Sequence, residues 1–136
     1  MPGVLKINHV AVAVNDSQES LSFWRDALGL RIKENRLVPE EDVRVTFLPI
    51  ADCEIELVQP TVEGSGLTRF LEKRGQGLHH VCLEVDDLDG LIIQLKEKKV
   101  RFIGDTPRVS SDGRKYAFVH PDSTSGVLVE LYESLV

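Results

Sequence analysis

Two segments of the chain alternate apolar with polar or small residues in the same way. In residues 7–14, Val10, Val12 and Val14 share one face of a predicted strand, and His9 lies on the other face with two alanines. Residues 79–85 show the same alternation around His80. Both segments carry the motif His-Val-x-x-x-Val-x-Asp, which begins at His9 and again at His80. The repetition predicts that the chain consists of two copies of one module.

A segment with helical spacing follows each of these strands. Asp16 is a predicted helix cap, apolar residues then recur at Leu21, Trp24 and Leu28, and Gly29 ends the helix. Asp87 caps a second predicted helix at 88–98. Three strands are predicted after each helix, at 30–35, 43–50 and 53–58 and then at 100–103, 116–120 and 126–132, with a polar loop at 105–113. The topology of each module is therefore βαβββ.

These elements define an α+β fold of one domain, residues 1–136. Its modules cover about 5–60 and 78–133, and a connector with a short helix, 61–77, joins them. A module of this size is marginal alone, so the two are expected to share a core or a sheet. Side by side, they predict an open, curved barrel around a cavity.

Composition narrows the class of function. The net charge of −6, without a run of basic residues, argues against nucleic acid as a partner. No apolar stretch reaches membrane-spanning length, so no membrane association is expected. Cys53 and Cys82 lack the spacing of a metal finger or redox pair, which favours a reducing compartment. We expect a cytoplasmic protein, or one of the mitochondrial matrix if a transit peptide has been removed.

Four side chains with metal-binding chemistry fall on the predicted inner faces of the strands: His9, Glu56, His80 and Glu130. A single histidine on a strand is usually structural, but the symmetric recurrence of a histidine and a glutamate in both modules favours a metal site. Two imidazoles and two carboxylates suit a divalent ion such as Co²⁺, Ni²⁺, Mn²⁺, Fe²⁺ or Zn²⁺. Such an ion would leave positions open for a chelating substrate and act as a Lewis acid on its carbonyl.

Several neighbouring residues have two readings each. Cys82 is expected to be a small apolar filler, and His79 to face away from the site. Glu54 and Glu84 are rim residues or a second acid/base, while His120 contacts substrate or only packs a turn. The remaining candidates are basic side chains that either meet an anionic substrate or are merely solvated: Arg69, Lys73, Arg74, Arg114 and Lys115.

Four stretches of the sequence resemble the methylmalonyl-CoA epimerase family of the vicinal oxygen chelate superfamily: residues 7–10, 70–80, 118–121 and 126–131. The resemblance implies His9, His80 and Glu130 as metal ligands and Glu56 as a further one. It also implies a divalent metal, with cobalt favoured, an acyl-CoA substrate and a homodimer. The implied reaction interconverts (2R)- and (2S)-methylmalonyl-CoA through a metal-stabilised enolate. Glu130 is a candidate catalytic residue for one proton transfer, and Glu56, Glu54 or a bound water for the other.

The sequence departs from that family at two positions and leaves two other functions open. Val45 stands where some members have a catalytic glutamate, and Asp122 where lysine is common. The first alternative is a glyoxalase I type isomerase, which the two His/Glu pairs favour and residues 70–80 disfavour. The second is a metal-free small-molecule-binding protein, against which the full set of four ligands counts.

Overall fold

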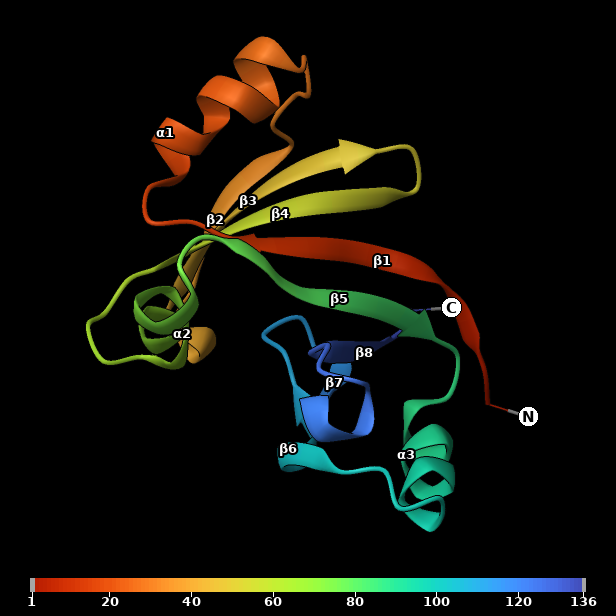
Figure 1. Ribbon diagram of the computed structural model, residues 1–136. Helices are drawn as coiled ribbons and strands as arrows, with labels where there is room; N and C mark the ends of the chain where they lie inside the picture. Colours follow the sequence, from red (N-terminus) through yellow and green to blue (C-terminus); the bar gives the residue numbers. More distant parts are fainter. Residues whose placement is uncertain (1, 136) are drawn as a thin grey trace. The chain divides into compact units, whose positions relative to one another are not determined.

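The computed structural model describes residues 2–135 and divides into two compact units (Figure 1). One unit spans His9–His79, and the other combines the N-terminal residues up to Asn8 with the residues from His80 onward. Each unit holds four of the eight strands of the sheet and follows the order of elements that the sequence predicts.

In the His9–His79 unit, the sheet has the order β2-β3-β4-β1, with β1 parallel to β4 and the other pairs antiparallel. Its strands are β1 (Val4–Ala13), β2 (Glu34–Val38), β3 (Val43–Ile50) and β4 (Cys53–Pro60). Its helical elements are α1 (Ser17–Leu21), the π-helical segment η1 (Ser22–Ala27), the 3-10 turn η2 (Pro39–Glu41) and α2 (Gly66–Arg74).

In the other unit, the sheet order is β5-β8-β7-β6, with β5 parallel to β8. Its elements are β5 (Gly77–Val85), α3 (Leu88–Glu97), β6 (Phe102–Val109), β7 (Lys115–Val119), the 3-10 turn η3 (Pro121–Ser123) and β8 (Val129–Glu133). The start of the chain is bonded to this unit: the Gly3 amide donates to the Asp86 carboxylate, and the Asp86 amide donates to the Gly3 carbonyl oxygen.

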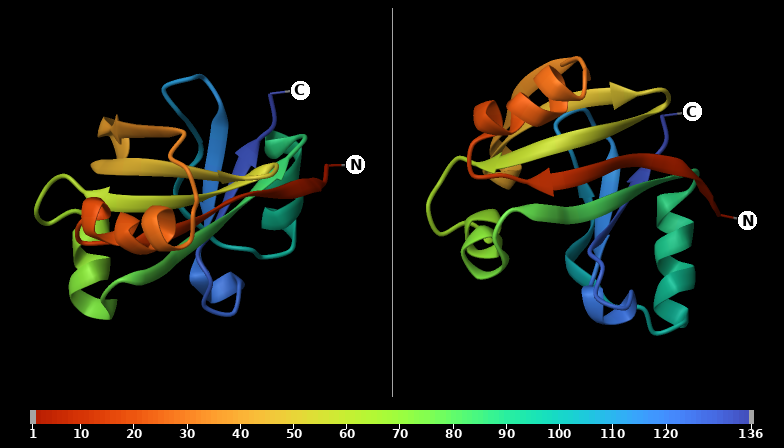
Figure 2. Two further views of the ribbon diagram at one scale, coloured as in Figure 1. Left: turned by 90° about the horizontal axis from the view of Figure 1, so that it is seen from above. Right: turned by 45° about the horizontal axis from the view of Figure 1, so that its top comes forward.

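The α1–η1 segment covers one face of its sheet, and its cap, its apolar stripe and its end lie where the sequence predicts them. The Asp16 carboxylate accepts a hydrogen bond from the Gln18 amide and so caps α1. Leu21 packs with Leu48 and Leu57 in a buried cluster. Gly29 ends the segment with φ +91°, a left-handed conformation that glycine adopts without strain. Figure 2 shows this segment lying along the strands.

The connector helix α2 packs on the opposite face of the same sheet, the face that carries His9. Ser65 caps it by accepting from the Thr68 amide. Leu67 and Leu71 join Ala11 and Ala13 in a buried cluster. The sequence predicts a cavity on this side of the sheet. α2 fills part of it in this unit, because the two alanines leave room for a helix to approach.

In the other unit, α3 covers the sheet with Leu88, Leu91 and Ile92, which pack against Val85 and Leu131 (Figure 2). The Asp87 carboxylate caps α3 through the Gly90 amide, and Glu133 accepts from the Leu88 amide. The first turn of α3 is thereby tied to β8.

Two predicted segments differ from the structure. The strand expected at 30–35 lies instead at Glu34–Val38, because β2 aligns with β3 by pairing Glu34 with Phe47 and Val38 with Val43. The polar loop expected at 105–113 is mostly strand, since β6 resumes after a register shift and pairs Arg108 with Tyr116. Among residues 2–135, no helix is long and apolar enough to cross a bilayer.

Candidate metal centre

The first predicted pair, His9 and Glu56, lies together on neighbouring strands of the His9–His79 unit. β1 and β4 run in parallel, with Ala11 opposite Glu56. The Nδ1 atom of His9 is 3.0 Å from a carboxylate oxygen of Glu56, and both side chains are almost completely buried. A carboxylate so far removed from water must be paired or coordinated. The strand parity predicted from sequence is therefore correct for both residues.

The second pair, His80 and Glu130, has the same arrangement in the other unit. β5 and β8 are also parallel, with Cys82 opposite Glu130. The Nε2 atom of His80 lies 3.0 Å from Glu130 Oε1, and both side chains are nearly buried. The edge of the Phe118 ring packs against the His80 imidazole at 5.6 Å between ring centres, which holds its orientation. The repeat in sequence is thus a repeat in geometry.

The spacing within each pair suits two ligands of one ion. Two donor atoms that bind an ion at about 2.1 Å each, at a right angle, lie ~3.0 Å apart. The measured nitrogen–oxygen separation is 3.0 Å in both pairs. Imidazole nitrogen and carboxylate oxygen are both ligands of divalent first-row metals. The donor separation in each pair is therefore compatible with two neighbouring ligands of one ion.

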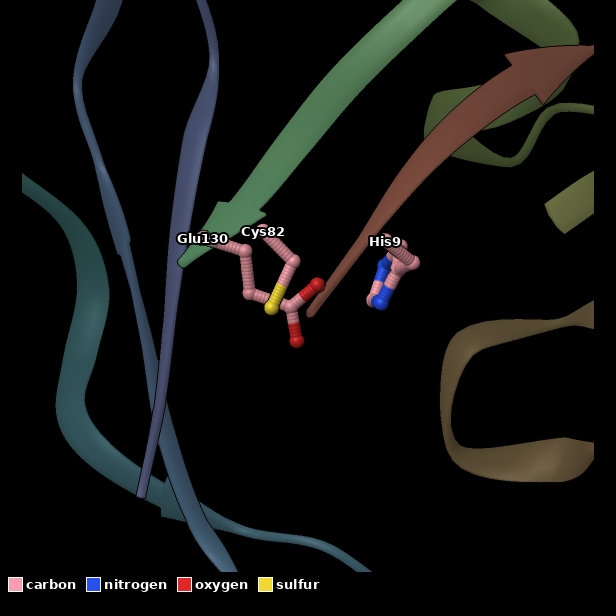
Figure 3. A group of neighbouring side chains, drawn as sticks. All are labelled: His9, Cys82 and Glu130. Carbon is pink, nitrogen blue, oxygen red and sulfur yellow. The ribbon is translucent and has the colours of Figure 1, made fainter. Parts of the chain in front are cut away.

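Cys82 adds a sulfur atom next to the second pair. Its Sγ and a carboxylate oxygen of Glu130 lie within 4.8 Å of each other, and the residue is fully buried. Figure 3 draws these two side chains from β5 and β8, with His9 from β1 as the third labelled residue. Because Cys82 and Glu130 are direct neighbours across the sheet, their side chains project from the same face.

Glu54 and Val45 surround the first pair on the same sheet face. Glu54 lies opposite His9, and one of its carboxylate oxygens is buried without a hydrogen bond, 3.5 Å from the Lys33 ammonium group. Val45 is buried with Val58 in the cluster that α2 covers. The position that would hold a catalytic glutamate in the resembled family is thus part of an apolar core.

The other candidates have structural partners. Glu84 accepts a hydrogen bond from the Asn8 amide, and His79 packs edge-on against Phe70. The Nδ1 atom of His120 accepts from the Asp122 amide, so this histidine caps the turn η3. His120 was expected either to contact substrate or to pack a turn, and the structure shows the turn packing.

Aromatic residues beside the second pair are absent from the predicted site. Phe118 lies opposite Glu130 and Tyr116 opposite Tyr132, so these side chains share the face that carries the ligands. The alternation of Tyr116 with Phe118 along one strand is the sequence signal that identifies them. Burial raises the pKa of Tyr132, and the Ser110 hydroxyl, by hydrogen bonding, lowers the pKa of Asp112.

Residues 8–118 match the family model of the Glyoxalase/Bleomycin resistance protein/Dioxygenase superfamily. The chain belongs to this superfamily, within the branch of the methylmalonyl-CoA epimerases. It is 40% identical to the mitochondrial methylmalonyl-CoA epimerase of Mus musculus, over 95% of this chain and 73% of that protein. It is 37% identical to the ethylmalonyl-CoA/methylmalonyl-CoA epimerase of Cereibacter sphaeroides, over 93% of this chain and 96% of that protein.

The fold is also that of solved methylmalonyl-CoA epimerase structures. A variant of the Streptomyces coelicolor methylmalonyl-CoA epimerase, in complex with 2-nitronate-propionyl-CoA, matches with a TM-score of 0.89 and 31% identity. The match covers 98% of this chain and 100% of that chain. The predicted α+β fold of the vicinal oxygen chelate type and the predicted family are therefore confirmed.

Proposed function

We propose that the protein is a methylmalonyl-CoA epimerase, which interconverts the (2R) and (2S) epimers of methylmalonyl-CoA. The observation that carries the proposal is the pair of buried histidine–glutamate contacts, His9–Glu56 and His80–Glu130, with equal separations of 3.0 Å. Relatives at 37–40% identity are named for this reaction. The reaction requires a site that binds two substrate oxygens and handles the proton on C2.

We also propose that His9, Glu56, His80 and Glu130 together hold one divalent metal ion per chain. Cobalt is the favoured ion, with Ni²⁺, Mn²⁺ and Zn²⁺ as alternatives. When bound, the ion supplies Lewis-acid polarisation of the thioester carbonyl, which makes the adjacent C–H more acidic. The contacts within each pair support this proposal because they already have the spacing of neighbouring ligands.

Glu130 and Glu56 are the proposed proton-transfer residues. Epimerisation removes the C2 proton from one side and returns a proton on the other, so it needs two groups. The two glutamates come from equivalent positions of the two modules, and each is buried beside a histidine that holds its carboxylate in place. With Val45 in an apolar cluster, Glu56 is the carboxylate that takes the second role.

The proposal extends to the binding partner, the oligomeric state and the location of the protein. The proposed binding partner is an acyl-CoA substrate. We propose no binding to nucleic acid or to membranes. We propose a homodimer of single-domain chains, located in the cytoplasm or, after removal of a transit peptide, in the mitochondrial matrix. The division into modules at about 5–60 and 78–133 stays a prediction.

Deuterium exchange tests the function directly. Cobalt-loaded protein is incubated in D2O with (2R)-methylmalonyl-CoA, and the label at C2 is followed by NMR or mass spectrometry. We expect deuterium at C2 and formation of the (2S) epimer, both abolished by a chelator. The hemithioacetal of methylglyoxal and glutathione is tested in parallel. Turnover of that compound without exchange into methylmalonyl-CoA would replace this proposal with a glyoxalase I type isomerase.

A further inference from the structure

A continuous row of aromatic side chains leads away from His80 along the ligand-bearing face of its unit. The Phe118 ring meets His80 at 5.6 Å, Tyr116 meets Phe118 at 6.1 Å, and Tyr132 meets Tyr116 at 6.4 Å. All three contacts are edge-on. The row ends at Arg114, whose guanidinium carbon lies 4.8 Å from the centre of the Tyr132 ring. A cation therefore marks one end of the wall that begins at the proposed metal ligand.

Arg114 is close to the ligand Glu130. Tyr132 follows Glu130 by two residues on β8, which places it on the same face about 7 Å further along the strand. The Arg114 guanidinium therefore lies over the next same-face residue after Glu130 on β8.

The Arg114 side chain is held in place, yet its charge is only weakly balanced. Its Nε atom is buried and has no hydrogen-bond partner. The nearest carboxylate oxygen, from Asp112, is 4.0 Å from Nε, beyond hydrogen-bonding distance. The Asp112 carboxylate instead accepts from the Ser110 hydroxyl, the Arg114 backbone amide and, at 3.5 Å, the Tyr132 hydroxyl. These bonds fix the loop around Arg114, and the Nε–H of its guanidinium is left without an acceptor.

We propose that Arg114 binds the free carboxylate of the acyl group and so selects malonyl-type thioesters over neutral acyl-CoA thioesters. The inference rests on the proposed function, because it assigns part of that substrate to a residue. A guanidinium presents paired N–H donors that match a carboxylate, and stacking on Tyr132 pre-orients them. The chain carries a net charge of −6, so an anionic substrate needs a local cation of this kind.

The phosphates of coenzyme A are the other anionic groups of the substrate, and position argues against them. They are separated from the thioester by the whole pantetheine arm, whereas Arg114 lies about two strand residues beyond Glu130. The carboxylate is attached to the same carbon atom as the reacting C–H and the thioester. It is therefore the anion that remains near the metal ligands.

Binding measurements with two ligands test the proposal. Calorimetry compares methylmalonyl-CoA with propionyl-CoA, which lacks the carboxylate, on metal-loaded wild type, Arg114→Met and Arg114→Lys. We expect Arg114→Met to weaken methylmalonyl-CoA binding ~10–100-fold and propionyl-CoA binding less than about twofold. Arg114→Lys keeps a charge without the planar fork and retains part of the preference. Arg101→Met is the matched control, since Arg101 is an exposed arginine of the same unit, paired with Asp122.

The possible results separate this inference from the proposed function. Arg114→Met could weaken the binding of both thioesters equally, or leave the preference for methylmalonyl-CoA over propionyl-CoA unchanged. Either result would show that Arg114 does not bind the carboxylate. Wild type that exchanges no deuterium into methylmalonyl-CoA would refute the function itself. Thermal unfolding of each variant checks that the loop remains folded.

Discussion

The Nδ1 atom of His9 lies 3.0 Å from a carboxylate oxygen of Glu56, and the two residues belong to strands that run parallel. His80 and Glu130 repeat this relationship on the parallel strands β5 and β8. In two neighbouring parallel strands, residues that lie opposite each other project their side chains to the same face of the sheet. Each module therefore places one nitrogen and one oxygen donor next to each other through its strand pairing alone.

Replacing His80 with alanine is expected to remove metal and activity together. The imidazole is a proposed ligand, and even residues outside the ligand set change metal affinity 10–100-fold, so we expect a loss of at least ~100-fold. Metal content after dialysis and calorimetric titration with Co²⁺ measure the effect. His79→Ala is the control, because His79 is the adjacent residue and packs on Phe70. A His80→Ala protein that keeps its cobalt would remove His80 from the ligand set.

Replacing Glu56 with glutamine separates metal binding from proton transfer. The amide keeps an oxygen donor but is a poor base at neutral pH. We expect the Co²⁺ affinity to fall by less than ~10-fold. The rate of deuterium exchange at C2 should fall by ~100-fold or more. Glu54→Gln, on the same strand and the same face, is the matched control. Exchange lost in Glu54→Gln and retained in Glu56→Gln would transfer the role to Glu54.

Introducing a glutamate at Val45 is expected to destabilise the protein. Val45 is 5% exposed and packs in the cluster of Ala11, Val58 and Leu71. A carboxyl group there lacks partners, and we expect the free energy of unfolding to fall by ~2–4 kcal/mol. Urea unfolding measures this change, with Val45→Ala as the control for lost volume. An unfolding midpoint equal to that of wild type would contradict the packing of α2 on this face.

Asp112 gives a prediction for pH. The hydrogen bond from Ser110 lowers the pKa of its carboxyl in the folded protein, and the nearby Arg114 lowers it further. A lowered folded pKa contributes stability that is present above the unfolded value of about 3.9 and is lost as pH falls through the folded value. The stability difference between wild type and Asp112→Asn should therefore be larger at pH 7 than at pH 3. Urea unfolding at both values measures it, with Asp105→Asn as the control; an equal difference at both would contradict the assignment.

Local patterns in the sequence predict much of the fold and the strand faces that carry the paired histidines and glutamates. Strand alternation identified the faces of His9 and His80, and Asp16 and Asp87 were identified as helix caps from their position before an apolar stripe. The family resemblance gave the same four ligands. These features depend on residues that are close in sequence, or on the repeat.

The features that the sequence did not reveal depend on contacts between distant residues. α2 covers Ala11 and Ala13 only because the chain returns to that face after β4. β6 extends through polar residues because Arg108 and Val109 pair with β7. The π-helical segment Ser22–Ala27 has no local signal that we recognise. The role of Arg114 required the position of Tyr132, which no spacing along the chain provides.

Ala11 and Ala13 have counterparts at Cys82 and Glu84 when the two copies of the motif are superimposed. The packing of α2 against the alanines is a difference between the two halves at equivalent positions of the motif. One copy carries small side chains against which a helix packs, while the other carries a thiol and an acid at the same positions. Exchanging these residues between the copies would therefore not be neutral, although the strands that carry them remain alike.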